Sequence, residues 1–269
     1  MFEISNFPEL TDLINLYSNS LTQSNNYLLG VAFDDLIKQR KLFYIKGKFN
    51  LYLLVDRNIS YQLYYFINNF QESFKNNIDK PLVIEVVYKG EIKKPRAIID
   101  YFELNGFSTH LTRDNMALSF TNEVTFRPHN INAHIKIANT KYEASYVCDL
   151  FASQLDIYTG DLKTQKEINK YIENGNILCA YYNDNLCGAL QFEIKNKVNW
   201  LGHLAVDLHY RGNGIASLLV ENYLKIGVAK SDTRFQLWVI NSNESAVNLY
   251  KKFRFTHTGK STISMLKLK

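Results

Sequence analysis

A glycine loop between a strand-like run and a helix-like run constrains the fold of this chain most. The run VNWLGHLAV over residues 198–206 has strand character, and the stretch HYRGNGIASLL over residues 209–219 follows it. The next apolar residues fall on one face of a helix: Ile215, Leu218, Leu219, Tyr223 and Ile226. Two glycines within three positions cost conformational entropy on folding, so the loop needs a backbone shape or a close approach that a side chain would forbid.

The loop predicts an anion site at the start of this helix. Free backbone N–H groups and the positive end of the helix dipole attract an anion, and glycine lets a phosphate come close. Arg211 can add a charge-assisted contact. A tight strand-to-helix turn with a solvated arginine explains the same residues, and the loop alone leaves both interpretations open.

Length and composition are typical of a globular protein. The chain has 269 residues, 46% of them hydrophobic, which is enough for one large domain or two ordinary ones. No apolar run approaches the roughly 20 residues that span a bilayer, and the start, MFEISNFPEL, does not resemble a secretion signal. The three cysteines, Cys148, Cys179 and Cys187, lack metal-ligand spacing. We therefore expect a cytoplasmic protein with no metal and no membrane contact.

The net charge of +5 is unevenly placed along the chain. Residues 1–132 hold 14 basic and 14 acidic side chains, whereas residues 133–269 hold 17 and 12. The sequence has no Lys/Arg run and no basic patch with interleaved aromatic residues, so a nucleic-acid partner is not expected. A small anionic ligand accounts for the local excess better.

Hydrophobic periodicity and turn residues predict the elements of the second part. In order, they are a strand at 134–138, helices at 142–155 and 164–173, a hairpin of 177–182 and 186–194, a strand at 198–206, a helix from 215, a strand at 235–240, a helix at 244–252 and a final hairpin from Thr256 to Leu268.

Two motifs in this part resemble those of the GNAT superfamily of acyl-CoA N-acyltransferases. The first is R-x-x-G-x-A, the pyrophosphate-binding motif, at Arg211, Gly214 and Ala216. The second is N-x-x-A-x-x-L-Y followed by an aromatic residue, at Asn243, Ala246, Leu249, Tyr250 and Phe255. The resemblance covers residues from about 133 to the C-terminus. The family commonly ends this helix with Gly-Phe, and here Arg254 precedes Phe255, so a different helix exit is expected.

The resemblance implies acetyl-CoA as co-substrate and a primary amine of a small molecule or peptide as acceptor. The diphosphate would lie on the amides of Gly212 to Ser217, Asn243 would contact the pantetheine arm, and a backbone N–H near Val206 would hold the thioester oxygen. The cofactor-binding residues it implies are Leu204, Ala205, Val206, Arg211, Gly212, Asn213, Gly214, Ile215, Ala216, Ser217, Asn243, Ala246 and Tyr250.

Acyl transfer to an amine also needs proton transfer. His203 and Glu193 are the candidate bases, although strand alternation places His203 opposite Leu204 and Val206, and a buried structural histidine remains the alternative. Tyr250 is the candidate acid for the departing thiolate, and its alternative is a tyrosine that only packs the helix.

The first part looks like a faded copy of the second. Aligning 97–118 with 246–266 superposes Phe102 on Tyr250, and aligning 51–70 with 201–220 runs the two segments parallel. This copy has no glycine loop and no hydroxyl at Phe102, so it should not bind or process acyl-CoA. Coincidental similarity of strand and helix patterns is the alternative.

We therefore predict an α/β (α+β) protein of two GNAT-like domains in tandem, each a mixed, mostly antiparallel sheet flanked by helices. Residues 1–120 form the degenerate domain, 121–132 the linker and 133–269 the catalytic domain. The first domain would be a scaffold or a wall of the acceptor site. A non-catalytic acyl-CoA sensor and a two-domain interaction protein are the rival functions, and the sequence indicates neither the acceptor nor the oligomeric state.

Overall fold

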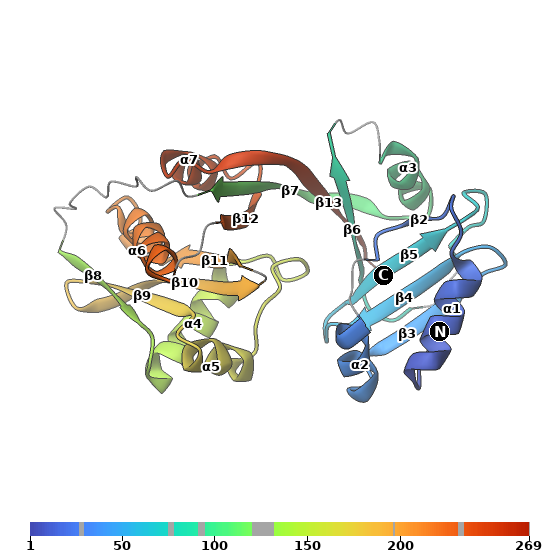
Figure 1. Ribbon diagram of the computed structural model, residues 1–269, viewed down its shortest axis with the longest axis horizontal. Coiled ribbons are helices and arrows are strands. Elements are labelled where there is room, and N and C mark those ends of the chain that lie inside the picture. Colours follow the sequence, from blue (N-terminus) through green and yellow to red (C-terminus); the bar gives the residue numbers. More distant parts are fainter. Residues whose placement is uncertain are drawn as a thin grey trace. The chain divides into compact units, whose positions relative to one another are not determined.

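The structure is a computed structural model that describes residues 1–26, 30–74, 78–90, 95–119, 132–195, 197–230 and 234–268. The predicted linker lies outside the described residues except for Asn132. The first elements in chain order are β1 (Phe2–Glu3), α1 (Phe7–Tyr17), β2 (Gln23–Ser24), α2 (Gly30–Lys38), β3 (Leu42–Lys46), β4 (Leu51–Asp56), β5 (Tyr61–Ile67), β6 (Leu82–Lys89), α3 (Arg96–Leu104) and β7 (Ser108–Ser119). The others are β8 (Ala133–Ile137), α4 (Lys141–Gln154), α5 (Gln165–Glu173), β9 (Ile177–Tyr182), β10 (Asn185–Lys195), β11 (Val198–Val206), α6 (Ile215–Ala229), β12 (Arg234–Ile240), α7 (Glu244–Lys252) and β13 (Thr256–Lys267) (Figure 1).

The chain forms two compact units that exchange strands. Unit 1 contains Met1–Thr112 and Lys260–Lys269, and unit 2 contains Arg113–Gly259. Strand β7 therefore begins in unit 1 and ends in unit 2, and β13 does the reverse. The units differ from the predicted domains 1–120 and 133–269 because strand pairing, and not position in the chain, decides which sheet a strand joins.

Unit 2 is built on a mixed sheet. Its strand order is β13-β7-β12-β11-β10-β9-β8. From β7 to β8 each described pair is antiparallel except β11 and β12, which are parallel. The end of β7 enters this sheet along Arg113–Ser119, opposite β12. This confirms the predicted fold class, a mostly antiparallel sheet with helices.

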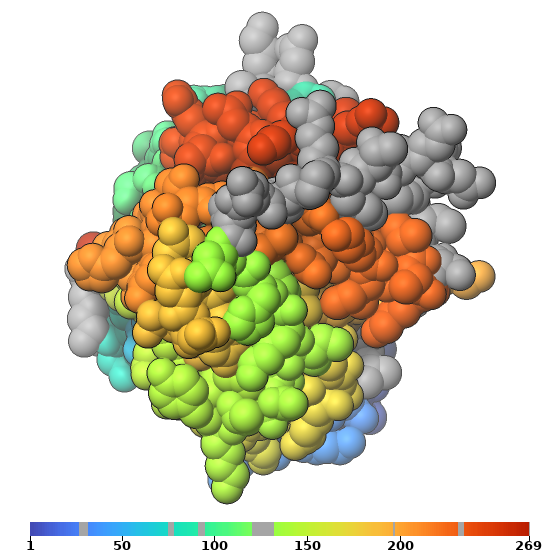
Figure 2. Space-filling view, turned by 90° about the vertical axis from the view of Figure 1, so that its left-hand side faces the viewer, coloured from blue at the N-terminus to red at the C-terminus, as the bar shows by residue number. Residues whose placement is uncertain are grey.

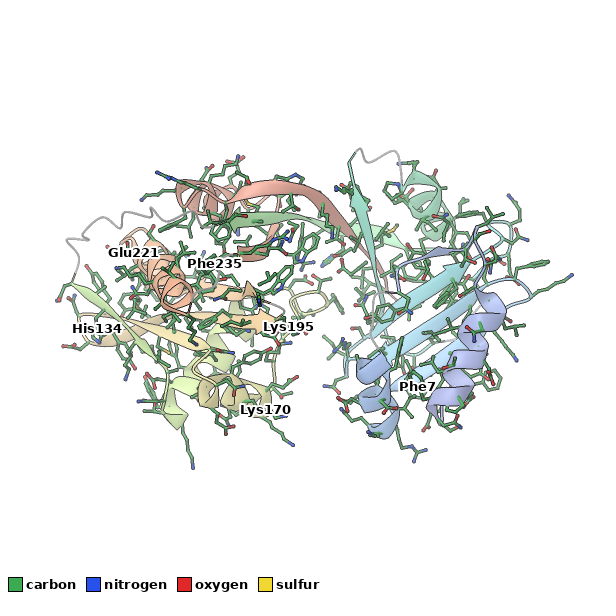
Figure 3. The ribbon with its side chains drawn as sticks, viewed as in Figure 1. Phe7, His134, Lys170, Lys195, Glu221 and Phe235 are labelled. Carbon is green, nitrogen blue, oxygen red and sulfur yellow. The ribbon has the colours of Figure 1, made fainter. Side chains whose placement is uncertain are left out.

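Helices cover both faces of the unit 2 sheet. Val147 and Phe151 of α4 and Ile168 of α5 are buried on one face, and α6 and α7 pack on the other. Phe235 of β12 is fully buried beneath α6, with its ring 5.4 Å from that of Tyr223 (Figure 3). Figure 2 shows one face of this unit, where the green atoms of β8 and α4 are exposed together with the orange atoms of α6. Within the described residues no helix is long and apolar enough to cross a bilayer.

Unit 1 repeats this plan with one element missing. Its sheet has the order β1-β3-β4-β5-β6-β13, with β2 paired to β5, and its parallel pair is β5 with β6. Helices α1 and α2 pack on one face and α3 on the other. Ile263 and Met265, from the C-terminal strand, complete the core beneath α3. Between β5 and β6 the described residues contain no helix, whereas unit 2 has α6 at the corresponding connection.

The predicted C-terminal hairpin is wrong, because Thr256–Lys267 is one continuous strand. Its Lys260–Lys267 part pairs antiparallel with β6, from Lys260 opposite Lys89 to Lys267 opposite Leu82. A strand of such a hairpin would have to pair with β12, and β7 already pairs with β12 at that edge. The continuous strand instead buries Ile263 and Met265 in the core of unit 1.

The internal repeat is clearest around α3 and α7. Both helices have nine residues, and the Phe102 ring lies 5.1 Å from Phe107 as the Tyr250 ring lies 5.9 Å from Phe255. The exits also match, because the N–H of each second aromatic residue donates to the carbonyl of the first, at 3.0 and 3.1 Å. Arg254 has φ +65°, close to the +85° of Gly106 in the first copy. The exit expected to differ is therefore the same, with an arginine in the left-handed conformation.

Arg254→Gly is expected to stabilise the protein by about 1 kcal/mol, because glycine adopts positive φ without the steric cost that a side chain carries. Urea unfolding measures the change. The reverse substitution in the first copy, Gly106→Ala, is the control and should lower the free energy of unfolding. An Arg254→Gly protein no more stable than the original would contradict the expectation.

The other part of the predicted repeat is shifted by one strand. The sequence alignment of 51–70 with 201–220 places β4 on β11. The strand of unit 1 that forms the parallel pair is β5, with Tyr61 opposite Leu82, so β5 corresponds to β11. Two adjacent buried strands have similar apolar patterns, which explains why the alignment chose the wrong one.

Candidate active site

The strands β11 and β12 separate toward their C-terminal ends. Their parallel pairing runs from Val198 opposite Arg234 to Leu201 opposite Leu237 and stops there. Both strands continue, β11 to Val206 and β12 to Ile240. The two strand ends therefore face each other across a gap without a hydrogen-bonded ladder.

A β-bulge lies where β11 leaves β12. Gln191 pairs with His203 and Phe192 pairs with Leu201, so Gly202 is an extra residue on β11. A Cβ at Gly202 would lie 2.0 Å from Oε1 of the buried Gln191, so a side chain there would force the Gln191 amide to move. A bulge bends its strand, which favours the separation from β12. Sequence reasoning missed this feature, although a glycine inside a strand is its usual signal.

The backbone at the end of β11 directs polar groups toward the gap. The Asp207 N–H donates to the Cys187 carbonyl at 2.8 Å, on the β10 side. Because successive residues of a strand alternate, Leu204 and Val206 direct their N–H and C=O groups to the opposite edge. The Val206 carbonyl accepts bonds of 3.1 Å from Gln154 Nε2 and Arg211 Nε. The ladder with β12 has ended before these residues, so it provides no partner for their N–H groups.

The loop after β11 has a defined conformation. The Asp207 side chain accepts a 2.9 Å bond from the His209 N–H and starts a short 3₁₀ turn. Gly212 and Gly214 have φ of +82° and +76°, in the left-handed region. A Cβ at Gly212 would meet no atom within 4 Å, so backbone conformation or the approach of another molecule, and not internal packing, requires glycine there.

The start of α6 presents free donors. Its first backbone bond runs from the Leu218 N–H to the Gly214 carbonyl, 3.1 Å, and the helix has no side-chain cap. In the described part of the chain, the N–H groups of Gly212 to Ser217 have no acceptor. Such groups, with the positive end of a 15-residue helix, form a site for an anion.

The Arg211 side chain holds this loop in place. Besides the Val206 carbonyl, its guanidinium reaches Gln154 Oε1 at the end of α4, 2.7 Å away. The arginine thus links the loop to β11 and α4 and keeps its charge beside the helix start. The sequence predicts a direct contact with the anion for this residue and does not foresee the tether through Gln154. Asn213 donates to the Tyr210 carbonyl at 3.1 Å.

Helix α7 carries the second motif. Asn243 is its N-cap and accepts a 3.1 Å bond from the Ala246 N–H. Tyr250 is buried in the core of unit 2, and its hydroxyl makes no hydrogen bond among the described residues. Burial raises the pKa of Tyr250 above its usual range, so the hydroxyl stays protonated at neutral pH.

The two candidate bases lie on neighbouring strands. The His203 ring packs edge-on against Phe151 of α4, 5.3 Å between centroids, and Nε2 lies 3.4 Å from the Asp161 carbonyl. It is therefore on the α4–α5 face, away from Leu204 and Val206, as alternation predicts. Burial lowers the pKa of His203, so the imidazole is neutral at pH 7. Glu193 forms an ion pair with Lys195 at 3.0 Å.

The family comparison covers the elements of this site. Residues 145–255 match the model of the acetyltransferase (GNAT) family, a range that includes the gap, the glycine loop and Tyr250. This part of the chain belongs to the GNAT family. A search of the curated proteins found no match.

Solved GNAT structures share the fold over most of the chain. A GCN5-related N-acetyltransferase from Sphaerobacter thermophilus has 12% identity, covers 81% of this chain and 76% of its own, and gives a TM-score of 0.61. A tandem GNAT protein from the clavulanic acid biosynthesis pathway has 10% identity, with coverages of 95% and 86% and a TM-score of 0.57. A GNAT acetyltransferase from Colwellia psychrerythraea has 16% identity, 99% and 98% coverage, and a TM-score of 0.56. Family and fold together support an N-acyltransferase.

In unit 1 the gap that corresponds to the one between β11 and β12 is closed by the chain itself. The parallel ladder of β5 and β6 ends at Leu63 opposite Ile84. Asn25, 7% exposed, donates to the Leu63 and Glu85 carbonyls at 3.3 and 2.9 Å and accepts a 2.8 Å bond from the Tyr65 N–H. One amide therefore joins the diverging strands. The missing glycines of the first copy predict that it is degenerate. The polar segment around Asn25 does not predict that this side chain joins the two strands.

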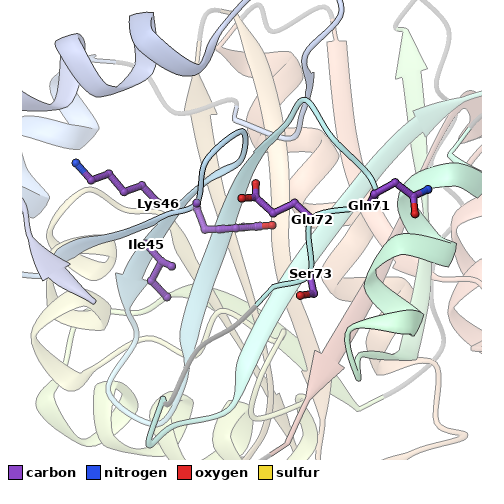
Figure 4. A pocket seen from close by; sticks show the side chains of 7 residues that line it. Ile45, Lys46, Gln71, Glu72 and Ser73 are labelled. Carbon is purple, nitrogen blue, oxygen red and sulfur yellow. The ribbon is translucent and has the colours of Figure 1, made fainter.

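A cavity of about 370 Å³ lies in unit 1. Its walls are Ile45, Lys46, Gly47, Tyr52, Gln71, Glu72 and Ser73. The Glu72 carboxylate is saturated by the N–H groups of Lys48, Phe49 and Asn50, at 2.6, 3.0 and 2.8 Å. Figure 4 shows Lys46 and Gln71 pointing away from Glu72. The carboxylate in this cavity is therefore already bound by backbone donors of the same unit.

A second cavity, of about 460 Å³, lies beneath α7 in unit 2. It is lined by Asp114, Met116, Val239, Val247, Lys251, Phe255, Thr256 and His257. His257 and Asp114 approach to 3.5 Å on its rim. Neither cavity is lined by a residue of the predicted GNAT cofactor site, which is an open loop and strand edge.

Proposed function

We propose that the protein is an acetyl-CoA-dependent N-acetyltransferase that acts on a primary amine of a small molecule or peptide, and that unit 2 carries the reaction. The observation that carries the proposal is the gap between β11 and β12, which opens beside a helix start with free N–H donors. An extended chain with amide groups fits the gap, and a diphosphate fits the helix start. Coenzyme A combines these two parts.

Different residues of unit 2 would bind the diphosphate and the pantetheine arm of the cofactor. The N–H groups of Gly212 to Ser217 would hold the diphosphate, with the Arg211 charge beside them. The strand edge from Leu204 to Val206, including Ala205, would pair with the pantetheine arm. Asn243 uses its oxygen as the helix cap, so its NH₂ group would face the arm.

The thioester of acetyl-CoA supplies an activated carbonyl carbon. The neutral amine attacks this carbon, a C–N bond forms, and the C–S bond breaks. The Leu204 or Val206 N–H groups would stabilise the negative charge on the carbonyl oxygen. Tyr250 would donate its proton to the thiolate, and a base would take the proton that the amine loses.

We propose His203 as this base, and Glu193 as the alternative. A His203→Gln protein should lose the acid limb of kcat/KM that lies below the ordinary histidine value of about 6.5, because the lowered pKa of His203 keeps it neutral and active down to more acid pH. The part of the pH profile that comes from ionisation of the amine substrate is the same in both proteins. The measurement is the pH profile with one amine. Glu193→Gln is the control, and if it alone moves the limb, the roles are reversed.

Gly214→Val should weaken CoA binding by roughly 10- to 100-fold, because valine strains a positive-φ helix start where the phosphate must approach. Calorimetric titration with CoA measures the affinity, and circular dichroism checks the fold. Gly175→Val is the matched control, since Gly175 has φ +68° but follows α5. Equal CoA affinity for Gly214→Val and the original protein would end the loop hypothesis.

A panel of amines tests the function itself. Release of the CoA thiol, followed with a thiol reagent, should depend on one class of amine and saturate with acetyl-CoA. A protein that binds CoA but releases no thiol with any amine would be an acyl-CoA sensor. A protein without saturable stabilisation by CoA would be an interaction protein.

A further inference from the structure

The loop between α4 and α5, residues 155–164, is held over the end of the gap in unit 2. His203 of β11 approaches its Asp161 carbonyl, 3.4 Å from Nε2. Gln154, just before the loop, donates to the Val206 carbonyl. The loop is folded tightly on itself, because the Asp156 carboxylate accepts the N–H and the hydroxyl of Thr159, both at 2.8 Å.

A third tether comes from the exchanged strand β7. Arg113 Nη2 donates to the Thr159 carbonyl at 2.9 Å and to its Oγ1 at 2.7 Å. Arg113 pairs with Ile240, the last residue of β12, so it lies at the end of β12 where the gap is open. By position in the sequence this strand belongs to the first half of the chain.

The amine must reach the thioester from the side of this loop. On the other face of the sheet, buried side chains of Val206, Val239 and Tyr250 fill the space behind the gap. The α4–α5 face carries His203 and the loop, together with Arg113. The acceptor therefore passes between the loop and the strand ends, and the position of the loop sets the shape of its entrance.

The fold does not itself require an arginine at this place. In unit 1, Met265 opposite Ile84 corresponds to Met116 opposite Leu237, each at the end of the parallel ladder. By this register the counterpart of Arg113 is Thr262 of β13. Thr262 donates to Glu85 Oε2 on β6, 2.7 Å away, and to no loop. The tether therefore occurs in unit 2, where the gap is open, and not in unit 1, where Asn25 closes the gap.

We propose that Arg113 is a positioning residue for the amine acceptor, so that the first half of the chain acts in recognition through β7. The inference rests on the proposed function. The Arg113 guanidinium holds Thr159 with two charge-assisted bonds, and the loop then presents a fixed wall to the acceptor.

The test is steady-state kinetics of the full chain with the best amine of the panel. Arg113→Met should raise the KM for the amine about tenfold or more and leave the KM for acetyl-CoA unchanged. Arg113→Lys keeps a charged donor, so it should raise the KM for the amine less than Arg113→Met does. Thr159→Val should raise the same KM, and the double variant should be no worse than Arg113→Met alone. Arg57→Met, at an exposed turn of unit 1, is the matched control.

Other results overturn the inference in distinguishable ways. An unchanged KM for the amine in Arg113→Met, equal rises of both KM values, or additive effects of the two variants would remove Arg113 from recognition while the function stands. If the original protein transfers acetyl to no amine, the proposed function fails, and this inference fails with it.

Discussion

A chain of residues 130–269 is expected to aggregate instead of folding, although it contains every residue of the predicted cofactor site. It lacks the part of β7 that pairs with β12, so β12 is left with an exposed edge. It also loses Met116 and Leu118 from the core of unit 2. Removing buried side chains of this size costs about 2–5 kcal/mol each, against a total stability of about 5–15 kcal/mol for an ordinary domain.

The same truncation exposes the end of β13. Ile263 and Met265 pack in the core of unit 1, and the shortened chain lacks residues 1–112 of that unit. A chain of residues 113–259 is the matched control, because it is contiguous and includes the whole of unit 2. It should be soluble and gain thermal stability from CoA in a saturable way. Soluble expression and thermal unfolding compare the two. Cooperative unfolding of a monomeric 130–269 chain would contradict the role of the strand exchange.

Tyr250→Phe is expected to lower kcat roughly 100-fold while CoA affinity and fold are preserved, because general acid catalysis usually contributes a factor of about 10²–10⁴. The hydroxyl is protonated and has no internal partner among the described residues, so its removal breaks no bond that stabilises the fold. The first copy shows that a phenyl ring suffices for packing here, since Phe102 is fully buried at the same place. Single-turnover and steady-state kinetics measure the change.

A second buried tyrosine of unit 2 gives the control. The Tyr223 hydroxyl donates to the Asn199 carbonyl at 2.9 Å, within the core. Tyr223→Phe should therefore lower the free energy of unfolding by about 1–3 kcal/mol, because the buried hydrogen bond between hydroxyl and carbonyl is lost, and should leave kcat near its original value. If Tyr250→Phe turns over at the original rate with a good amine, Tyr250 is a packing residue and another group protonates the thiolate.

The elements of unit 2 could be predicted from the sequence because their signals are local. The apolar run at 198–206 and the helix at 244–252 have the predicted bounds. The two glycines of the loop were expected to need a special backbone shape, and both have positive φ. Periodicity, turn residues and caps depend on residues only a few positions apart. They can therefore be recognised without knowing which segment packs against them.

The roles of the side chains around the site could be predicted only in part. The motif located Arg211 and Tyr250, but not the Gln154 tether or the Thr159 tether of Arg113. Nor did the polar segment around Asn25 indicate that this side chain joins the diverging strands of unit 1. These contacts join residues that are distant in the sequence, and a single sequence has no signal for such pairs.

The sequence by itself determined most elements of unit 2, the family motifs and the repeat of α3 and α7. Only the tertiary structure decided which sheet receives β7 and which receives β13. Both strands follow equivalent helices and carry similar apolar patterns, so each fits beside the last strand of either sheet. A strand's sequence specifies its buried face but not its neighbour, because backbone hydrogen bonds are the same for every partner. The choice depends on the packing of both cores together.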